Sequence, residues 1–156
     1  MKLFGIILLT GLSFFNSIPA PAQQQVEIQE LIETFFEGMR LGDTSMISNT
    51  IADHVELKSI YTDSKSGETK LVDEEMDNFI KSISGKPDNV VYDERLLSFD
   101  IKIDGPMAIA WTPYRFYLNE KFSHCGVNLF TLAHYSVGWR IVSITDTRRR
   151  ADCEPD

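Results

Sequence analysis

The chain has 156 residues, about the length of one domain with a single core, and 43% of them are hydrophobic. Acidic residues outnumber Lys and Arg by 23 to 15, which gives a formal net charge of −8 at pH 7. Phosphate backbones and anionic lipid surfaces repel such a chain, so the composition argues against a nucleic acid partner.

Residues 1–22 have the pattern of a cleavable signal peptide. Lys2 supplies a short positive region, residues 3–15 are apolar and uncharged, and residues 20–22 (Ala-Pro-Ala) form a small-residue cleavage site. A transmembrane anchor is the competing interpretation, but the apolar run is shorter than the ~20 residues that span a bilayer. We therefore expect one mature domain over residues 23–156, periplasmic or secreted, with no stable membrane insertion after cleavage.

An amphipathic helix is predicted over residues 26–41. Its apolar side chains recur at helical spacing, and glutamates occupy the other faces. Gly42 can end this helix in the left-handed conformation, and Asp43 or Thr44 can cap a second, shorter helix. Two helices therefore precede the first predicted strand.

A strand and a short hairpin follow the two helices. Residues 55–61 alternate between two faces, and residues 65–67 (Lys-Ser-Gly) supply a turn. Asp73 is expected to cap a third helix, whose first turn gathers the acidic residues that a helix dipole favours at its N-terminus. This third helix has one apolar stripe, formed by Met76, Phe79, Ile80 and Ile83.

The rest of the chain, after Pro87, is predicted to form strands. Apolar and polar residues alternate over 97–104, and turn signals recur at 104–106, 119–120 and 137–138. This spacing predicts four long antiparallel strands in hairpin succession. Strands of that length curl, and a strongly curved antiparallel sheet with the three helices packed on its concave side would bury the helical stripes.

The order of these elements resembles the nuclear transport factor 2-like (SnoaL-like) superfamily. The local carriers are FFEGMRLGDTSMISNTIADHVEL at 35–57 and GWRIVSITDTRR at 138–149, which are similar to the exit of the first helix and to the last strand of these domains. The resemblance implies an α+β cone-shaped fold, often with a pocket at the wide end and a sheet-to-sheet dimer. The superfamily includes ketosteroid isomerase, scytalone dehydratase, polyketide cyclases and many uncharacterised exported bacterial proteins.

The reactions of that superfamily are not carried over to this chain. In ketosteroid isomerases a general-base aspartate lies on the first strand, but here Lys58 and Ser59 occupy the corresponding stretch. A dehydratase of the scytalone type would need paired histidines with an aspartate, and the predicted pairing separates the histidines. No reaction is therefore assignable from the sequence.

Hairpin geometry suggests a ligand pocket on one face of the sheet. The predicted turns place Phe99 beside Trp111, Trp111 beside Asn128, and Arg115 beside His124. Asn128 is then a single amide among large apolar side chains, which suits either a ligand pocket or a bonded core residue. The candidate ligand-binding residues are Tyr61, Phe79, Phe99, Trp111, Tyr114, Arg115, His124, Asn128, Phe130 and Asp146.

Two alternatives concern the side chains at this pocket. Pro113 can introduce a bulge that reverses the inward and outward faces beyond it, turning Tyr114 and Phe116 inward. Asp146 and Arg148 are expected to form an exposed ion pair rather than a catalytic site.

The two cysteines are expected to form a disulfide. An oxidising compartment favours it, and a hairpin turn at residues 136–139 places Cys125 opposite Arg150, three residues before Cys153. A metal pair lacks support because the sequence has no CxxC motif and His124 alone cannot complete a zinc site. We expect no metal and no cofactor.

The favoured function is binding. The domain would hold a small, partly apolar ligand or a partner protein, and the outer sheet face would support a homodimer through Val127, Leu129, Val142 and Ile144. The alternative is a cofactor-free lyase or isomerase, which is less favoured because no two ionisable groups can be placed together in one apolar pocket.

Overall fold

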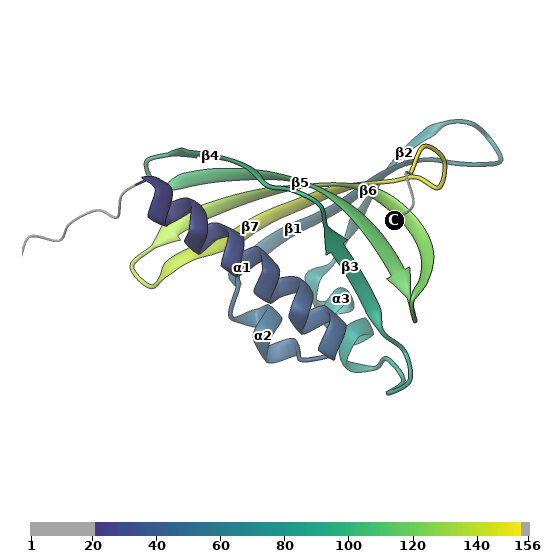
Figure 1. The fold of residues 1–156 in the computed structure, drawn as a ribbon, viewed down its shortest axis with the longest axis horizontal. Coiled ribbons are helices and arrows are strands. Elements are labelled where there is room, and N and C mark those ends of the chain that lie inside the picture. The colour runs from purple at the N-terminus through teal and green to yellow at the C-terminus, as the bar shows by residue number, and fades with distance from the viewer. Residues whose placement is uncertain (1–20, 154–156) are drawn as a thin grey trace, which may run out of the picture.

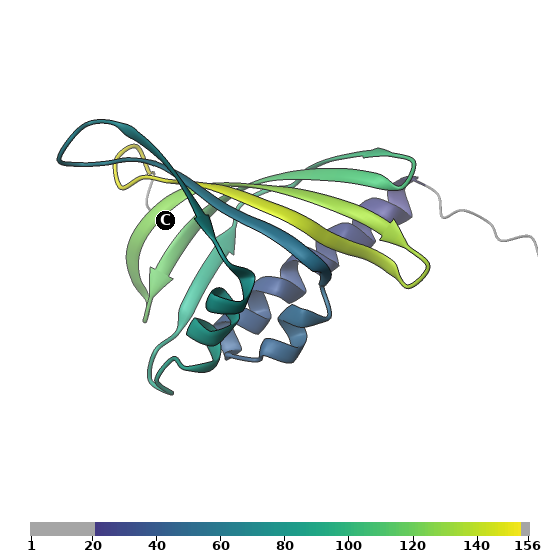
Figure 2. The ribbon, with the colours of Figure 1, turned by 180° about the vertical axis from the view of Figure 1, so that it is seen from behind.

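Three helices pack on the concave side of one curved sheet in the computed structural model, which describes residues 21–153 (Figures 1 and 2). The helices are α1 (Pro21–Leu41), α2 (Thr44–Ser48) and α3 (Met76–Ser84). The strands are β1 (Ile51–Thr62), β2 (Thr69–Glu74), β3 (Tyr92–Leu96), β4 (Asp100–Asp104), β5 (Met107–Leu118), β6 (Lys121–Tyr135) and β7 (Gly138–Arg148). The expected α+β architecture is confirmed.

The sheet has seven strands in the order β2-β1-β7-β6-β5-β3, and β4 pairs with β5 beyond the end of β3. All pairs are antiparallel except β1 with β7, which is parallel. The prediction of four long strands after Pro87 is wrong in one respect. The first of them is divided into β3 and β4, with a break over residues 97–99.

The start of the chain follows the helical prediction closely. Helix α1 begins at Pro21, five residues before the predicted start, and Gly42 follows it with a φ of 77°. The Asp43 side chain caps α2 by accepting hydrogen bonds from the backbone N–H groups of Ser45 (2.9 Å) and Met46 (3.2 Å). Most of the predicted signal peptide, residues 1–20, lies outside the described residues.

The predicted cap of the third helix is wrong. Asp73 lies in β2 opposite Lys58, because the β1–β2 ladder continues as far as the pair Leu57 and Glu74. Helix α3 begins only at Met76, and the Glu75 side chain at its N-terminus makes no capping hydrogen bond. The predicted apolar stripe survives this shift, since Phe79, Ile80 and Ile83 all pack against the core.

The predicted register between β5 and β6 is wrong by one residue. The turn at 119–120 forms as expected, but the pairing shifts between Phe116 and Tyr117, so that Ser123 is an extra residue in β6. Asn128 therefore faces Thr112 rather than Trp111. Trp111 is 49% exposed, which removes it from the predicted pocket.

Pro113 does not reverse the faces of β5. Ala108, Ala110, Thr112 and Tyr114 are all buried, so the alternation runs through the proline without a break. Tyr114 does point inward, as the alternative proposed, but it does so because the register of the whole strand differs from the prediction.

The predicted disulfide between Cys125 and Cys153 is present, with 5.9 Å between the two Cα atoms. Cys125 pairs with Arg149 rather than Arg150, because the β6–β7 turn is tight and a further register shift follows at Leu132.

The core lies between the sheet and α1. Ile28, Ile32 and Phe35 from α1 are buried against Phe130 and Ile141 of the sheet. Ile144 is only 4% exposed, so it cannot contribute to the predicted outer-face patch. No helix among residues 21–153 is both long and apolar enough to cross a membrane.

Candidate functional site

A cavity of about 280 Å³ opens between the helices and the concave face of the sheet. One wall is aromatic: Phe35 on α1 stacks on Phe79 of α3 with 5.8 Å between ring centroids, and Phe116 on β5 stacks on His124 of β6 at 4.9 Å. These four side chains come from four different elements of the fold. The cavity therefore has the apolar wall that small-molecule sites require.

The opposite corner of the cavity is polar and centres on Asp146 of β7, which is only 6% exposed. Its carboxylate accepts hydrogen bonds from the Ser59 hydroxyl, from Arg148 Nε (2.8 Å) and from the Tyr114 hydroxyl (3.2 Å). The ion pair between Asp146 and Arg148 predicted from the sequence therefore forms, but Asp146 is buried rather than exposed. Because β7 lies between β1 and β6 near the centre of the sheet, both residues line the cavity.

A second carboxyl group lies in the same corner. Glu94 projects from β3, and the Asn128 side-chain amide donates to its Oε1 over 2.7 Å. Burial raises the pKa of Glu94 to about 8; Asn128 opposes this shift, and the charge of Asp146 adds to it. At neutral pH Glu94 is therefore mostly a neutral carboxylic acid. Among residues 21–153, no hydrogen bond is formed by its Oε2.

Two further titratable side chains of the cavity, Tyr114 and His124, also favour their neutral forms. Burial raises the pKa of Tyr114, with the charges of Glu94 and Asp146 adding to the effect. Burial likewise lowers the pKa of His124, and the positive charge of Arg148 contributes. In the same corner Arg148 forms a salt bridge with Asp146 over 2.8 Å.

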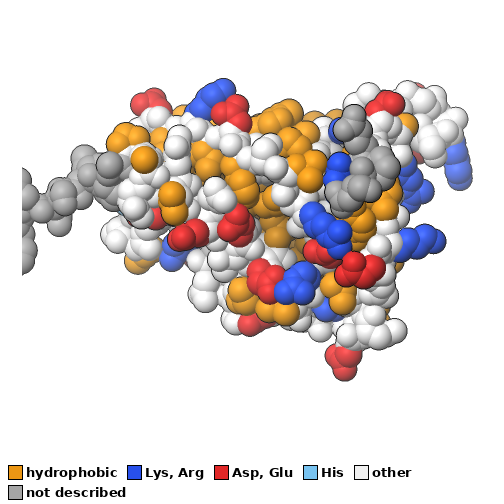
Figure 3. All heavy atoms as spheres, viewed as in Figure 1, with side chains coloured by type: hydrophobic (Ala, Val, Ile, Leu, Met, Phe, Trp, Pro, Cys, Tyr) orange, Lys and Arg blue, Asp and Glu red, His pale blue; other side chains and the backbone are white. Residues whose placement is uncertain are grey.

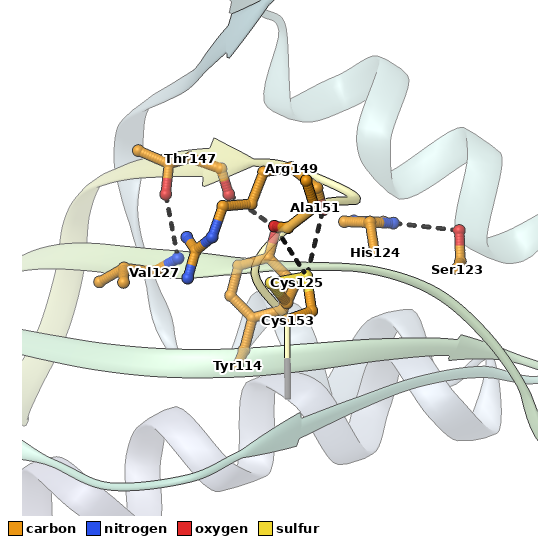
Figure 4. The surroundings of a disulfide bond; sticks show 9 residues. All are labelled: Tyr114, Ser123, His124, Cys125, Val127, Thr147, Arg149, Ala151 and Cys153. Atoms are coloured by element: carbon orange, nitrogen blue, oxygen red, sulfur yellow. Dashed lines mark hydrogen bonds between the residues drawn. A yellow bond between two sulfur atoms is a disulfide. The ribbon is translucent and has the colours of Figure 1, made fainter. Parts of the chain in front are cut away.

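The disulfide anchors the strand ends beside this corner (Figure 4). The Tyr114 hydroxyl donates a hydrogen bond over 3.0 Å to the backbone carbonyl of Thr147, two residues before Arg149 of the Cys125–Arg149 bridge. Gly126 allows this approach, since a Cβ there would lie 1.7 Å from the Thr147 carbonyl oxygen. The position of Tyr114 therefore depends on a glycine and a cystine that are outside the cavity lining.

A second hollow, of about 230 Å³, shares Glu94 with the cavity but is mainly charged. Its lining includes Arg40, which binds Glu37, and Asp93, which binds Arg95. Figure 3 shows charged side chains of both signs over β3 and the end of α1, next to an apolar strip. These groups neutralise one another at the surface, so we treat the first cavity as the candidate site.

The structure brings together half of the candidate ligand-binding residues predicted from the sequence. Those that line the cavity are Phe79, Tyr114, His124, Asn128 and Asp146. Phe130 lies behind the cavity wall, fully buried and edge-to-face with Phe36.

The remaining four candidates lie elsewhere. Tyr61 is at the far end of β1 opposite Lys70, and Phe99 lines the charged hollow beside α1. Trp111 is on the outer face of the sheet. Arg115 pairs with Arg95 of β3 and is outside the cavity lining, so the predicted contact between Arg115 and His124 does not occur.

Sequence reasoning missed Glu94, Ser59 and Arg148 as parts of one site. A signal for Glu94 was present, since it alternates with Tyr92 and Leu96, both of which pack against the core. A carboxyl group between two inward apolar residues of one strand faces the same interior. The sequence carries no such signal for Ser59, which reaches Asp146 only because β1 and β7 pair in parallel.

No group of three or more His, Cys, Asp or Glu side chains within residues 21–153 is arranged to hold a metal ion. The polar corner is instead a closed set of hydrogen bonds with one free carboxyl oxygen, which suits contact with an organic molecule.

Comparison with known proteins identifies the fold. No protein-family model and no curated protein matches the sequence. Among solved structures, a nuclear transport factor 2-like protein of unknown function from Shewanella baltica matches with a TM-score of 0.63 at 14% identity, over 86% of this chain and 100% of that one. A superfamily protein from Salmonella enterica serovar Typhimurium matches with a TM-score of 0.63 at 16% identity, over 88% and 99% of the two chains.

A third structure carries a functional name. It is a proposed dehydratase of the same family from Streptomyces avermitilis, which matches with a TM-score of 0.63 at 13% identity, over 85% of this chain and 100% of that one. At these identities the comparisons establish the fold alone.

Proposed function

We propose that this chain, which has the nuclear transport factor 2-like fold, binds a small, mostly apolar and uncharged molecule in its cavity, and that Glu94 holds that molecule's single hydrogen-bond acceptor. The observation that carries the proposal is the Glu94 carboxyl group, which accepts a hydrogen bond from Asn128 on one oxygen and has a raised pKa, in a cavity with one aromatic wall. The export expected from residues 1–22 is part of the proposal, so the ligand would be met outside the cytoplasm.

The charge state of the site selects the ligand's chemistry. With Oε1 of Glu94 accepting from Asn128, the acid proton lies on Oε2 and can be donated to a ligand oxygen. A ligand anion would meet Asp146 close by, while Arg148 is already bound to that carboxylate. A neutral ketone, ester or alcohol therefore fits better than a carboxylate of the same carbon skeleton.

The test has two parts. Native mass spectrometry of the protein purified gently from its host reports whether a small molecule is retained, and calorimetry compares cyclohexyl methyl ketone with cyclohexylacetate and cyclohexylethylamine. We expect the ketone to bind most tightly. If the acid or the amine binds better, the assignment of Glu94 as a neutral donor is wrong.

A matched pair of variants locates the binding. Ser82 lines the cavity, whereas Ser84, two residues along the same helix, is outside its lining. We expect Ser82→Trp to weaken ketone binding and Ser84→Trp to leave it unchanged. Equal effects of the two substitutions would place binding outside the cavity.

A cofactor-free lyase or isomerase is the second candidate, and one observation favours it. A carboxyl group with a pKa of about 8 can both take up and return a proton near neutral pH, and the neutral hydroxyl of Tyr114 lies in the same corner. The name of the Streptomyces structure is consistent with such chemistry. The test is deuterium exchange at the carbon next to a bound ketone, followed by NMR: exchange that is lost in Glu94→Gln supports catalysis, and its absence in the native protein leaves the binding function alone.

A further inference from the structure

Strand β2 forms one open edge of the sheet. Its six residues, Thr69–Glu74, are all exposed and, within the described part of the chain, pair only with β1. The β1–β2 hairpin extends past the other strands and away from the helices (Figure 2). Leu71 is 61% and Val72 is 42% exposed, so this edge presents apolar side chains that nothing within residues 21–153 covers.

Alternate residues of β2 direct their backbone N–H and C=O groups away from β1. Asp63 N–H donates to Glu68 C=O in the hairpin turn, which makes these two residues a hydrogen-bonded pair. Such pairs recur every second residue in an antiparallel ladder, so Lys70, Val72 and Glu74 direct their backbone groups to β1. The N–H and C=O groups of Thr69, Leu71 and Asp73 therefore point away from the sheet.

We propose that β2 pairs with β2 of a second copy of this chain, antiparallel and centred on Val72, so that two sheets join edge to edge. In this register Lys70 of each copy faces Glu74 of the other, and the two Val72 side chains face each other on the same side of the sheet. Two opposite-charge pairs and one apolar pair thus form across the axis.

Charge selects this register over its neighbours. A two-fold axis normal to the sheet keeps each face continuous, so allowed registers differ by one position of the centre. Centring on Lys70 or on Asp73 would place like charges face to face, and centring on Leu71 would place Glu68 opposite Glu74. The Val72 register avoids all of these contacts.

Formation of this dimer would break one existing ion pair of β2, and that pair contributes little stability. Lys70 now binds Glu68 at 2.6 Å, but their side chains are 45% and 66% exposed, so that pair contributes little stability. Lys70 can exchange Glu68 for the partner's Glu74 while Leu71 and Val72 lose exposed apolar surface.

Sedimentation equilibrium of the protein purified from its host tests this proposal by charge reversal. We expect a dimer whose Kd rises about tenfold or more in Lys70→Glu and in Glu74→Lys, and returns towards the native value in the double variant. A monomeric native protein would overturn the proposal. A dimer whose Kd is unchanged by both charge reversals, but which dissociates in Trp111→Lys, would also overturn it. That outcome would place the interface on the outer sheet face.

A backbone variant separates edge pairing from loss of the hairpin. Leu71 directs its N–H away from β1, so Leu71→Pro removes an outward donor without breaking the β1–β2 ladder. We expect this variant to keep the native circular dichroism spectrum and to be monomeric. A folded Leu71→Pro protein that still dimerises with the native Kd would contradict the proposal.

Discussion

The side-chain amide of Asn128 on β6 donates to the carboxyl group of Glu94 on β3 over 2.7 Å, across the intervening strand β5. Cross-strand neighbours seldom reach over a whole strand, and here the contact is possible because the sheet curves around the cavity. The bond places a partly buried acid against an amide donor, so both the charge state of Glu94 and the shape of the site depend on it.

The first prediction concerns pH. Because its pKa is raised from 4.5 to about 8, folded Glu94 keeps a proton between these values that the unfolded chain has lost. This group's contribution to the free energy of unfolding is therefore intact below pH 4.5 and falls as the pH rises towards 8. Glu94→Gln removes that loss. We expect the free energy of unfolding of the variant to exceed that of the native protein by roughly 1–3 kcal/mol at pH 9 and by almost nothing at pH 4.

Urea denaturation at a series of pH values measures this difference. Glu56→Gln is the control, because Glu56 is exposed and its pKa is lowered by Lys58. A constant difference between native protein and Glu94→Gln across the series would show that Glu94 titrates normally.

The second prediction concerns Asp146. Asp146→Asn removes a buried charge that Ser59 and Arg148 bind, and we expect the free energy of unfolding to fall by about 2–4 kcal/mol. Because the charge of Asp146 raises the pKa of Glu94, that pKa should fall in the variant. Carbon-13 NMR of the Glu94 carboxyl group measures it. Ser59→Ala keeps the charge of Asp146, so it should lower the free energy of unfolding by about 1 kcal/mol and leave the pKa of Glu94 raised.

Local patterns predicted the helices and the turns because these depend on neighbours in the sequence. Gly42, Asp43 and the hairpin turn before Lys121 act within a few residues, and each forms where the sequence places it. The order of helices and strands then constrained the sheet to a curved antiparallel type. Those signals were sufficient for the fold.

The site was harder to predict because it depends on register. One additional residue, Ser123 in β6, moves Trp111 to the outer face and sets Asn128 opposite Thr112. Turn signals do not reveal such a bulge, since it lies inside a strand. Glu94 was missed because β3 was merged with β4 into one strand, although the two strands pair with different parts of β5.

The third prediction concerns the disulfide. Cys125 and Cys153 are 28 residues apart, and a loop of this size predicts a loss of about 3–4 kcal/mol in the free energy of unfolding when both are replaced by Ala. Guanidinium denaturation measures it. Reductant should destabilise the native protein and leave the double variant unchanged. A native protein insensitive to reductant would show that the disulfide contributes nothing to stability.

The last prediction isolates the support of Tyr114. A methyl group on Gly126 would lie 1.7 Å from the Thr147 carbonyl oxygen and 2.8 Å from Tyr114 Cε1, so Gly126→Ala must separate β6 from β7 beside the cavity. We expect a loss of about 2–4 kcal/mol in the free energy of unfolding and weaker ligand binding, measured by urea denaturation and calorimetry. Gly67→Ala is the control: its φ is 72° with no atom within 4 Å, so strain alone should cost about 1 kcal/mol and binding should not change. If the two variants behave alike, the close approach of β6 and β7 does not position Tyr114.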